Sequence, residues 1–174
     1  KRSRPPKTRI RPVMHRLLEQ IEAPAIVSTV YGDYLATNAL GRALYAPVFD
    51  SREQPANSAR FTFLDPAAAD FYPEWDRVAT ELVAHLRSEA GRNPYDRQLS
   101  DLVGELSTRS DEFRVRWAAH NVRFHHTGTK HIQHPVVGEL DLRYETMELG
   151  ADGLTVAIFT AEPGSASQQA LDLL

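Results

Sequence analysis

Apolar residues recur every three or four positions through much of the chain, and this spacing predicts amphipathic helices. Pro12 suits a first helical turn and is expected to open a helix over 13–21. The apolar residues that share one face of this helix are Val13, Leu17, Leu18 and Ile21. Asn38 is a good N-cap for a second, short helix over 39–45.

The same helical spacing dominates the middle of the chain. Asp65 and Pro66 form a favourable pair of N-cap and first helical residue. Pro73 repeats the first-turn role for a longer helix, which is expected to run to about Ala90 and to end at Gly91. The apolar face of this longer helix carries Val78, Leu82, Val83 and Leu86.

A polar loop over 51–60 precedes this helical block, and two more helices complete it. One is predicted over 96–106 from its apolar stripe. The other is capped by Ser110, carries Phe113 and Trp117 four positions apart, and ends near residue 120.

Three segments change to the two-residue period of strands. The string AIVSTVYGDYLATN (25–38) predicts a hairpin with its tight turn at Gly32-Asp33. ELDLRYET (139–146) alternates apolar and charged residues strictly, which is typical of a half-buried strand with one face in water. LTVAIFTA (154–161) predicts a further strand.

A short helix over 165–174 closes the chain. The order is therefore helix, hairpin, helical block, a run of three or four strands and a last helix, which predicts an α+β fold with an antiparallel sheet. Two early strands, a block of helices and a late meander are also the layout of a PAS-like sensor domain. We expect the helices to cover one face of the sheet, with a pocket between the two layers.

Composition narrows the class of protein. The 174 residues are 42% hydrophobic and 25% charged, as in soluble globular domains, and one domain of this length can bury a full core. The absence of cysteine excludes disulfides, thiolate metal sites and cysteine nucleophiles. No apolar run approaches the length of a membrane span, and we expect a cytoplasmic protein without a membrane partner.

Charge is unevenly distributed along the chain. Residues 1–11 contain six basic residues and no acid, which leaves 14 basic against 23 acidic residues in 12–174, a net charge of −9. The acidic body is a poor surface for DNA. We therefore interpret 1–11 as a linker to a missing N-terminal domain and 12–174 as the globular domain, although a basic arm can also contact phosphate.

Four of the seven histidines fall in the string HHTGTKHIQH (125–134), which raises the question of a metal site. We expect 122–127 and 130–134 to pair as a hairpin about Gly128-Thr129. Two histidines then lie on each face of the hairpin: His126 with His131, and His125 with His134. Zinc requires three or four ligands that converge on one point, so neither a metal nor another cofactor is expected.

Other chemistry has little support in the sequence. Nucleophile elbows, zinc-protease motifs and glycine-rich nucleotide loops are all absent. A haem sensor would need a helical axial ligand, for which His85 and His120 are the candidates. The aromatic residues of the helical block are most simply core, but rings that face a single sheet can also enclose an apolar pocket. A small enzyme using that pocket and a purely structural module are the alternatives to a sensor.

Three strings together point to a known family: the helical block from FLDPAAADFYPEW onward, GTKHIQHPVVGELDLRYETMEL, and FTAEPGSASQQALDLL. They resemble the C-terminal ligand-binding domain of MmyB-like transcription regulators, which are found mainly in actinobacteria. The resemblance covers about 12–174. It implies a PAS-like fold that holds a small lipophilic, fatty-acid-like effector and regulates an attached XRE-type helix-turn-helix domain.

The resemblance also extends to single residues. Trp117, His120, Val122 and Arg123 match the family pattern W-x-x-H-D-V-R, whereas Asn121 replaces its usual acid. The matches to the following block are Lys130, His134, Pro135, Gly138, Glu139, Leu140, Tyr144 and Glu145. Arg123 can hold an acidic head group bidentately, or it can pair with Glu139 or Glu145 on the sheet.

We therefore predict the effector-binding domain of a DNA-binding transcription regulator, not an enzyme. It would bind DNA only through its missing N-terminal domain, and we expect a homodimer. The candidate ligand-binding residues are Phe71, Trp75, Leu82, Leu86, Trp117, His120, Arg123 and Tyr144.

Overall fold

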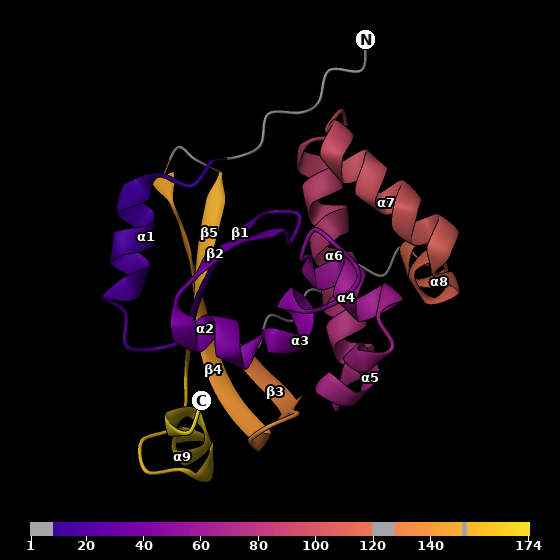
Figure 1. The fold of residues 1–174 in the computed structure, drawn as a ribbon. Coiled ribbons are helices and arrows are strands. Elements are labelled where there is room, and N and C mark those ends of the chain that lie inside the picture. The colour runs from indigo at the N-terminus through magenta and orange to yellow at the C-terminus, as the bar shows by residue number, and fades with distance from the viewer. Residues whose placement is uncertain (1–8, 120–127, 151–152) are drawn as a thin grey trace.

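A computed structural model describes residues 9–119, 128–150 and 153–174. These residues form a five-stranded antiparallel sheet with the spatial order β2-β1-β5-β4-β3. The strands are β1 (Ala25–Thr29), β2 (Tyr34–Thr37), β3 (Thr129–His134), β4 (Gly138–Glu148) and β5 (Leu154–Thr160). The early hairpin thus joins the late meander along β1 and β5, and the α+β, PAS-like fold is confirmed (Figure 1).

The helices of the described residues lie mostly between β2 and β3 in the sequence. They are α1 (Pro12–Glu19), α2 (Ala39–Leu44), α3 (Ala46–Phe49), α4 (Ser58–Leu64), α5 (Ala67–Phe71), α6 (Trp75–Arg92), α7 (Arg97–Arg109), α8 (Asp111–Ala118) and α9 (Ala166–Asp172). Asn38 and Ser110 cap α2 and α8 through their side chains, as predicted. No helix of the described residues combines the length and apolar character needed to cross a bilayer.

Four local predictions need correction. The stripe of α1 is only partly correct: Leu18 is buried as predicted, but Val13 and Leu17 are 40% and 52% exposed, and Met14 is buried instead. The predicted loop 51–60 ends early, since Asn57 accepts hydrogen bonds from the N–H groups of residues 59 and 60 and so opens α4. Two further differences concern helix ends.

Gly91 does not end α6, which runs on to Arg92. This glycine has no neighbour within 4 Å of where a side chain would begin, and an exposed glycine is tolerated in a helix. Asp65 ends α4, and α5 begins at Ala67 behind Pro66. The Asp65 carboxylate still accepts a hydrogen bond from the Ala67 N–H at 2.9 Å. Asp65 therefore caps the following helix as predicted, but this helix begins at Ala67 and not at Pro66.

Helices lie on both sides of the sheet, with α1 on one side and α4 to α8 on the other (Figure 1). On the α1 side, Leu18 packs against Val27, Leu154 and Val156. The opposite face of the sheet presents Ile26, Ile132 and Leu140, among others, to the helical block. The predicted half-buried character of β4 is confirmed, since Leu140 and Leu142 are buried while the charged residues between them are exposed.

The helical block has a core of its own, away from the sheet. Leu99, Leu102 and Leu106 of α7 pack with Val83 of α6 and Phe113 of α8. Helix α7 therefore covers α6 and α8, and α6 is the long helix that faces the sheet.

A side-chain hydrogen bond joins the first hairpin to the start of α7. The Tyr31 hydroxyl donates a hydrogen bond to the Asp96 carboxylate, which also caps α7 by accepting from the Leu99 N–H at 3.1 Å. Both bonds favour the ionised acid, and the bond from Tyr31 is the main reason why the pKa of Asp96 lies below its usual 3.8.

This contact predicts how stability depends on pH. A carboxyl whose pKa is lower in the folded protein stabilises it above the unfolded-state pKa and loses that contribution as pH falls through the folded-state pKa. Asp96→Asn keeps an N-cap but cannot ionise, and we expect it to lower the free energy of unfolding by about 1 kcal/mol at pH 7. Urea unfolding of both proteins at pH 7, 4 and 3 should show this difference shrinking with acid. A difference that stays constant would contradict the assignment.

Candidate functional site

A cavity of about 250 Å³ lies between the helix-covered face of the sheet and α6. All five strands contribute to one wall, and α6 supplies the other. The cavity's lining side chains include Ile26, Tyr34, Tyr45, Leu82, Lys130 and Tyr144. A cavity between sheet and helices is what the PAS-like layout predicts.

The α6 wall follows from helical spacing. Val78, Leu82 and Leu86 lie four residues apart, so they form one stripe along the helix, and all three line the cavity. Across from them, Ile26 of β1 and Ala157 of β5 are directly paired in the sheet and line the cavity as well. The middle of the cavity is therefore apolar.

Aromatic rings close one side of the cavity. The ring centroids of Tyr45 and Phe159 are 5.3 Å apart, those of Tyr144 and Phe159 are 5.7 Å apart, and Tyr34 meets Tyr45 edge-on at 6.0 Å. Burial raises the pKa of Tyr144 to about 12 and raises the pKa values of Tyr34 and Tyr45 further still. These phenols therefore stay protonated at neutral pH and can donate hydrogen bonds to a ligand.

Lys130 of β3 brings a positive charge to the aromatic side. Its ammonium nitrogen lies 5.7 Å from the ring centroid of Tyr72 and 5.5 Å from that of Tyr144. Burial is the main cause that lowers the pKa of Lys130 below 10.5. The candidate list from the sequence omitted this residue, although alternation along β3 places Lys130 on the same face as the buried Ile132 and His134.

An ion pair borders the lysine. The Glu81 carboxylate lines the cavity and lies 3.0 Å from the Nε atom of Arg77, one helical turn earlier on α6. Arg77 also reaches Glu74 at 3.2 Å and donates to the Thr129 hydroxyl at 3.3 Å. The bond to Thr129 joins the start of α6 to the start of β3.

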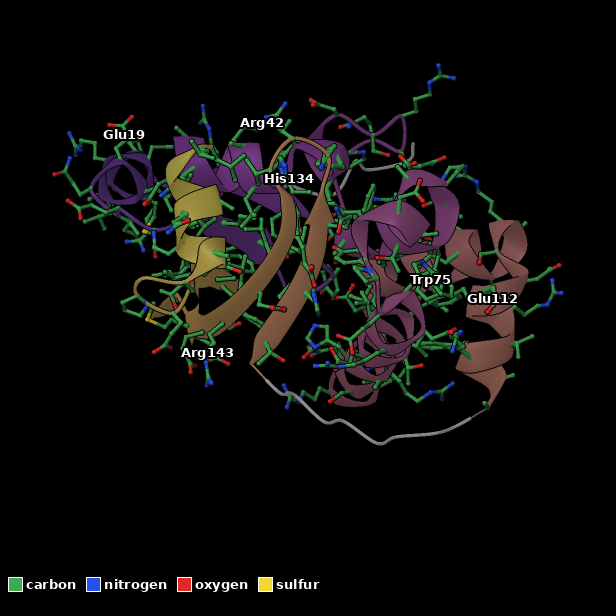
Figure 2. All side chains as sticks on the ribbon, turned by 90° about the horizontal axis from the view of Figure 1, so that it is seen from below. Glu19, Arg42, Trp75, Glu112, His134 and Arg143 are labelled. Carbon is green, nitrogen blue, oxygen red and sulfur yellow. The ribbon has the colours of Figure 1, made fainter. Side chains whose placement is uncertain are left out.

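The structure places the eight predicted ligand-binding residues in three groups. Leu82, Leu86 and Tyr144 line the cavity. Phe71, Trp75 and Trp117 pack elsewhere: Phe71 lies in the core beside Phe61, Trp75 donates from Nε1 to the Thr62 carbonyl at 2.9 Å, and Trp117 stacks on Phe113. Figure 2 shows Trp75 inside the helical block. His120 and Arg123 lie outside the described residues.

The predicted hairpin of 122–127 with 130–134 stays a prediction, because its first strand lies outside the described residues. Thr129 is the first residue of β3, and this strand pairs with β4, so that His131 lies opposite Asp141 and His134 opposite Gly138. Residues 122–127, including His125 and His126, lie outside the described part of the chain. His131 and His134 do face opposite sides of β3, as alternation predicts.

The two described histidines of this strand have different surroundings. His134 is buried, with Nε2 2.9 Å from the Ala43 carbonyl and Nδ1 accepting from the Val136 N–H, so its imidazole joins α2 to the β3–β4 turn. His131 lies 2.9 Å from Glu139 and 3.1 Å from Asp141, both more than two-thirds exposed. In the described part of the chain, these three residues form the group whose ligand atoms are close enough to share a metal ion. Hydrogen bonds from the imidazole account for the arrangement.

Comparison with known proteins agrees with this architecture. Residues 10–174 match the family model of the MmyB-like transcription regulator ligand binding domain. No curated protein matches the chain.

Proposed function

The chain belongs to the MmyB-like transcription regulator ligand binding domain family, and from this premise we propose that the cavity between the sheet and α6 binds a small lipophilic effector. The apolar strip of Val78, Leu82 and Leu86 facing Ile26 is the observation that supports this proposal. An aliphatic chain along this strip would lose contact with water where it lies against these side chains, which is the driving force for its binding.

We place the effector within a larger regulator. Residues 1–11 would link this domain to an N-terminal helix-turn-helix domain of the XRE type, which contacts DNA while this domain does not. The whole regulator would act in the cytoplasm, as a homodimer. Its action on DNA would come from ligand binding and not from catalysis.

Helix α6 is suited to transmit the presence of a ligand. Leu86 lines the cavity and also belongs to the core of the helical block, where it packs with Leu106 and Phe113. A ligand that displaces α6 would therefore disturb the packing of α7 and α8. For this to change DNA affinity, the ligand must bind two arrangements of the domain with different affinities.

Blocking the cavity tests the proposal. Leu82→Trp should fill the apolar strip and weaken the binding of both decanoate and 1-decanol at least about tenfold, because the volume they need is occupied. Titration calorimetry on the full chain measures both affinities. Leu173→Trp, at a site 79% exposed in the described structure, is the matched control and should bind like the wild type.

Native mass spectrometry of protein purified from cells gives an independent measurement. An acyl compound should accompany the wild type and be absent from Leu82→Trp. If the wild type binds neither probe in solution and carries no small molecule from cells, the proposed function is wrong.

A further inference from the structure

We propose that Lys130 binds an anionic head group, a carboxylate in the simplest case, and so orients the effector in the cavity. This inference rests on the proposed function, since it assumes that the cavity holds a small molecule. It adds the chemical class of the ligand's polar end and a residue that binds it. The head group would lie at the β3–β4 side, and the aliphatic part would run along Leu82 toward Leu86.

Glu81 favours the charged form of Lys130 but does not form an ion pair with it within the described structure. Within the described residues Lys130 forms no ion pair, and the acid that shares the cavity with it, Glu81, is already held by Arg77 at 3.0 Å. Segment 120–127, which precedes β3, contains no acidic residue that could serve instead. No carboxylate of the described residues therefore contacts the Lys130 ammonium directly.

Removing an ammonium from bulk water is costly unless an anion or several hydrogen-bond acceptors replace the water. The faces of Tyr72 and Tyr144 lie 5.7 and 5.5 Å from the Lys130 ammonium and replace only part of its hydration. Burial accordingly lowers the pKa of Lys130. A ligand carboxylate would restore the missing interaction with a charge-assisted hydrogen bond.

The surrounding groups favour the same ligand. Tyr144 lies beside Lys130, and its phenol stays protonated at neutral pH, so it offers a carboxylate no repulsion. The apolar strip begins next to them at Val78. One end of the cavity is therefore suited to an anion and the adjoining part to a hydrocarbon chain.

A pair of probes separates head-group recognition from burial of the chain. Decanoate and 1-decanol have the same chain length, and only decanoate is charged. Lys130→Met keeps the unbranched shape and removes the charge, so it should weaken decanoate binding about 10- to 100-fold and leave 1-decanol within about twofold of the wild type. Arg143→Met removes a positive charge from the exposed face of the adjacent strand β4 and is the matched control (Figure 2).

The outcomes distinguish the two proposals. The inference is supported if Lys130→Met binds decanoate more weakly while its affinity for 1-decanol and both affinities of Arg143→Met stay like those of the wild type. If Lys130→Met and the wild type bind decanoate equally well, the inference is wrong and the proposed function still holds. The same conclusion follows if the wild type binds 1-decanol but not decanoate. Equal weakening of both probes in Lys130→Met also overturns the inference, because the side chain would then act through packing.

A second measurement observes the amine of Lys130 directly in the wild-type protein. Outside residues 1–11, Lys130 is the only lysine of the sequence. After reductive methylation with ¹³C-formaldehyde, its dimethylamine signal can be identified by comparison with Lys130→Met. Decanoate should shift this signal and raise the pKa of Lys130, and 1-decanol should do neither. An unchanged signal at saturating decanoate overturns the inference.

Discussion

Replacing Phe113 with alanine is expected to lower the free energy of unfolding by about 3–5 kcal/mol. The Phe113 side chain is completely buried in the core of the helical block. Its ring stands edge-on to that of Phe63, with centroids 5.2 Å apart, and stacks on Trp117 at 5.6 Å. Alanine would remove both ring contacts and leave a cavity in a core that three helices enclose, which limits how far the site can collapse.

The size of this loss can be measured by urea unfolding followed by circular dichroism. Val115→Ala is the control, because it removes apolar atoms from the same helix at a position that is 65% exposed. We expect this control to change the unfolding free energy by no more than about 0.5 kcal/mol. A loss below about 1 kcal/mol for Phe113→Ala would show that α8 contributes little to the stability of the folded domain.

Features set by local physics could be predicted from the sequence. The caps Asn38 and Ser110 act on N–H groups three residues away, so their helices were correctly placed. The alternation of β4 identified its buried residues, because successive side chains on a strand must point to opposite faces. The order of these elements was then enough to predict the layers of the fold.

Features that depend on tertiary partners could not be predicted in the same way. Which face of α1 is buried depends on how the helix packs against β1 and β5. In the structure Leu18 contacts these strands, whereas Leu17 points to solvent. The pairing of β3 with β4 is also a tertiary outcome, because the sequence of a strand does not determine which neighbour it joins. The short turn between His134 and Gly138 joins β3 to β4, and the sequence pattern alone gave it no advantage.

The candidate site shows the same division. The stripe of Leu82 and Leu86 follows from helical period, and both residues line the cavity. The aromatic residues could not be divided between core and cavity, because a ring's spacing does not reveal what it packs against. Phe113 and Trp117 belong to the helical core, whereas Tyr34 and Tyr45 reach the cavity from the early hairpin and the short helix region. Lys130 could have been recognised from its alternation with Ile132, as a charge on a buried face.

Gly41→Ala is expected to destabilise the protein by about 3 kcal/mol, although alanine is a much better helix former than glycine. Gly41 lies in α2, where this helix crosses the first residue of β1. A Cβ atom at this position would lie 2.6 Å from the Ala25 carbonyl oxygen and would also overlap the Thr37 hydroxyl. That hydroxyl donates to the same carbonyl at 2.8 Å, so neither group can move without breaking the junction of α2 with the sheet.

The same substitution at Gly104 is expected to change the free energy of unfolding in the opposite direction. Gly104 lies inside α7, and no atom approaches within 4 Å of the position that its Cβ would take. Alanine there should raise the unfolding free energy by about 0.5–1 kcal/mol, because it lowers the backbone entropy lost on folding. Thermal and urea unfolding of both variants measure the contrast. If Gly41→Ala instead stabilised the protein, helix propensity alone would decide the result at both positions. The close packing of α2 against β1 would then be contradicted.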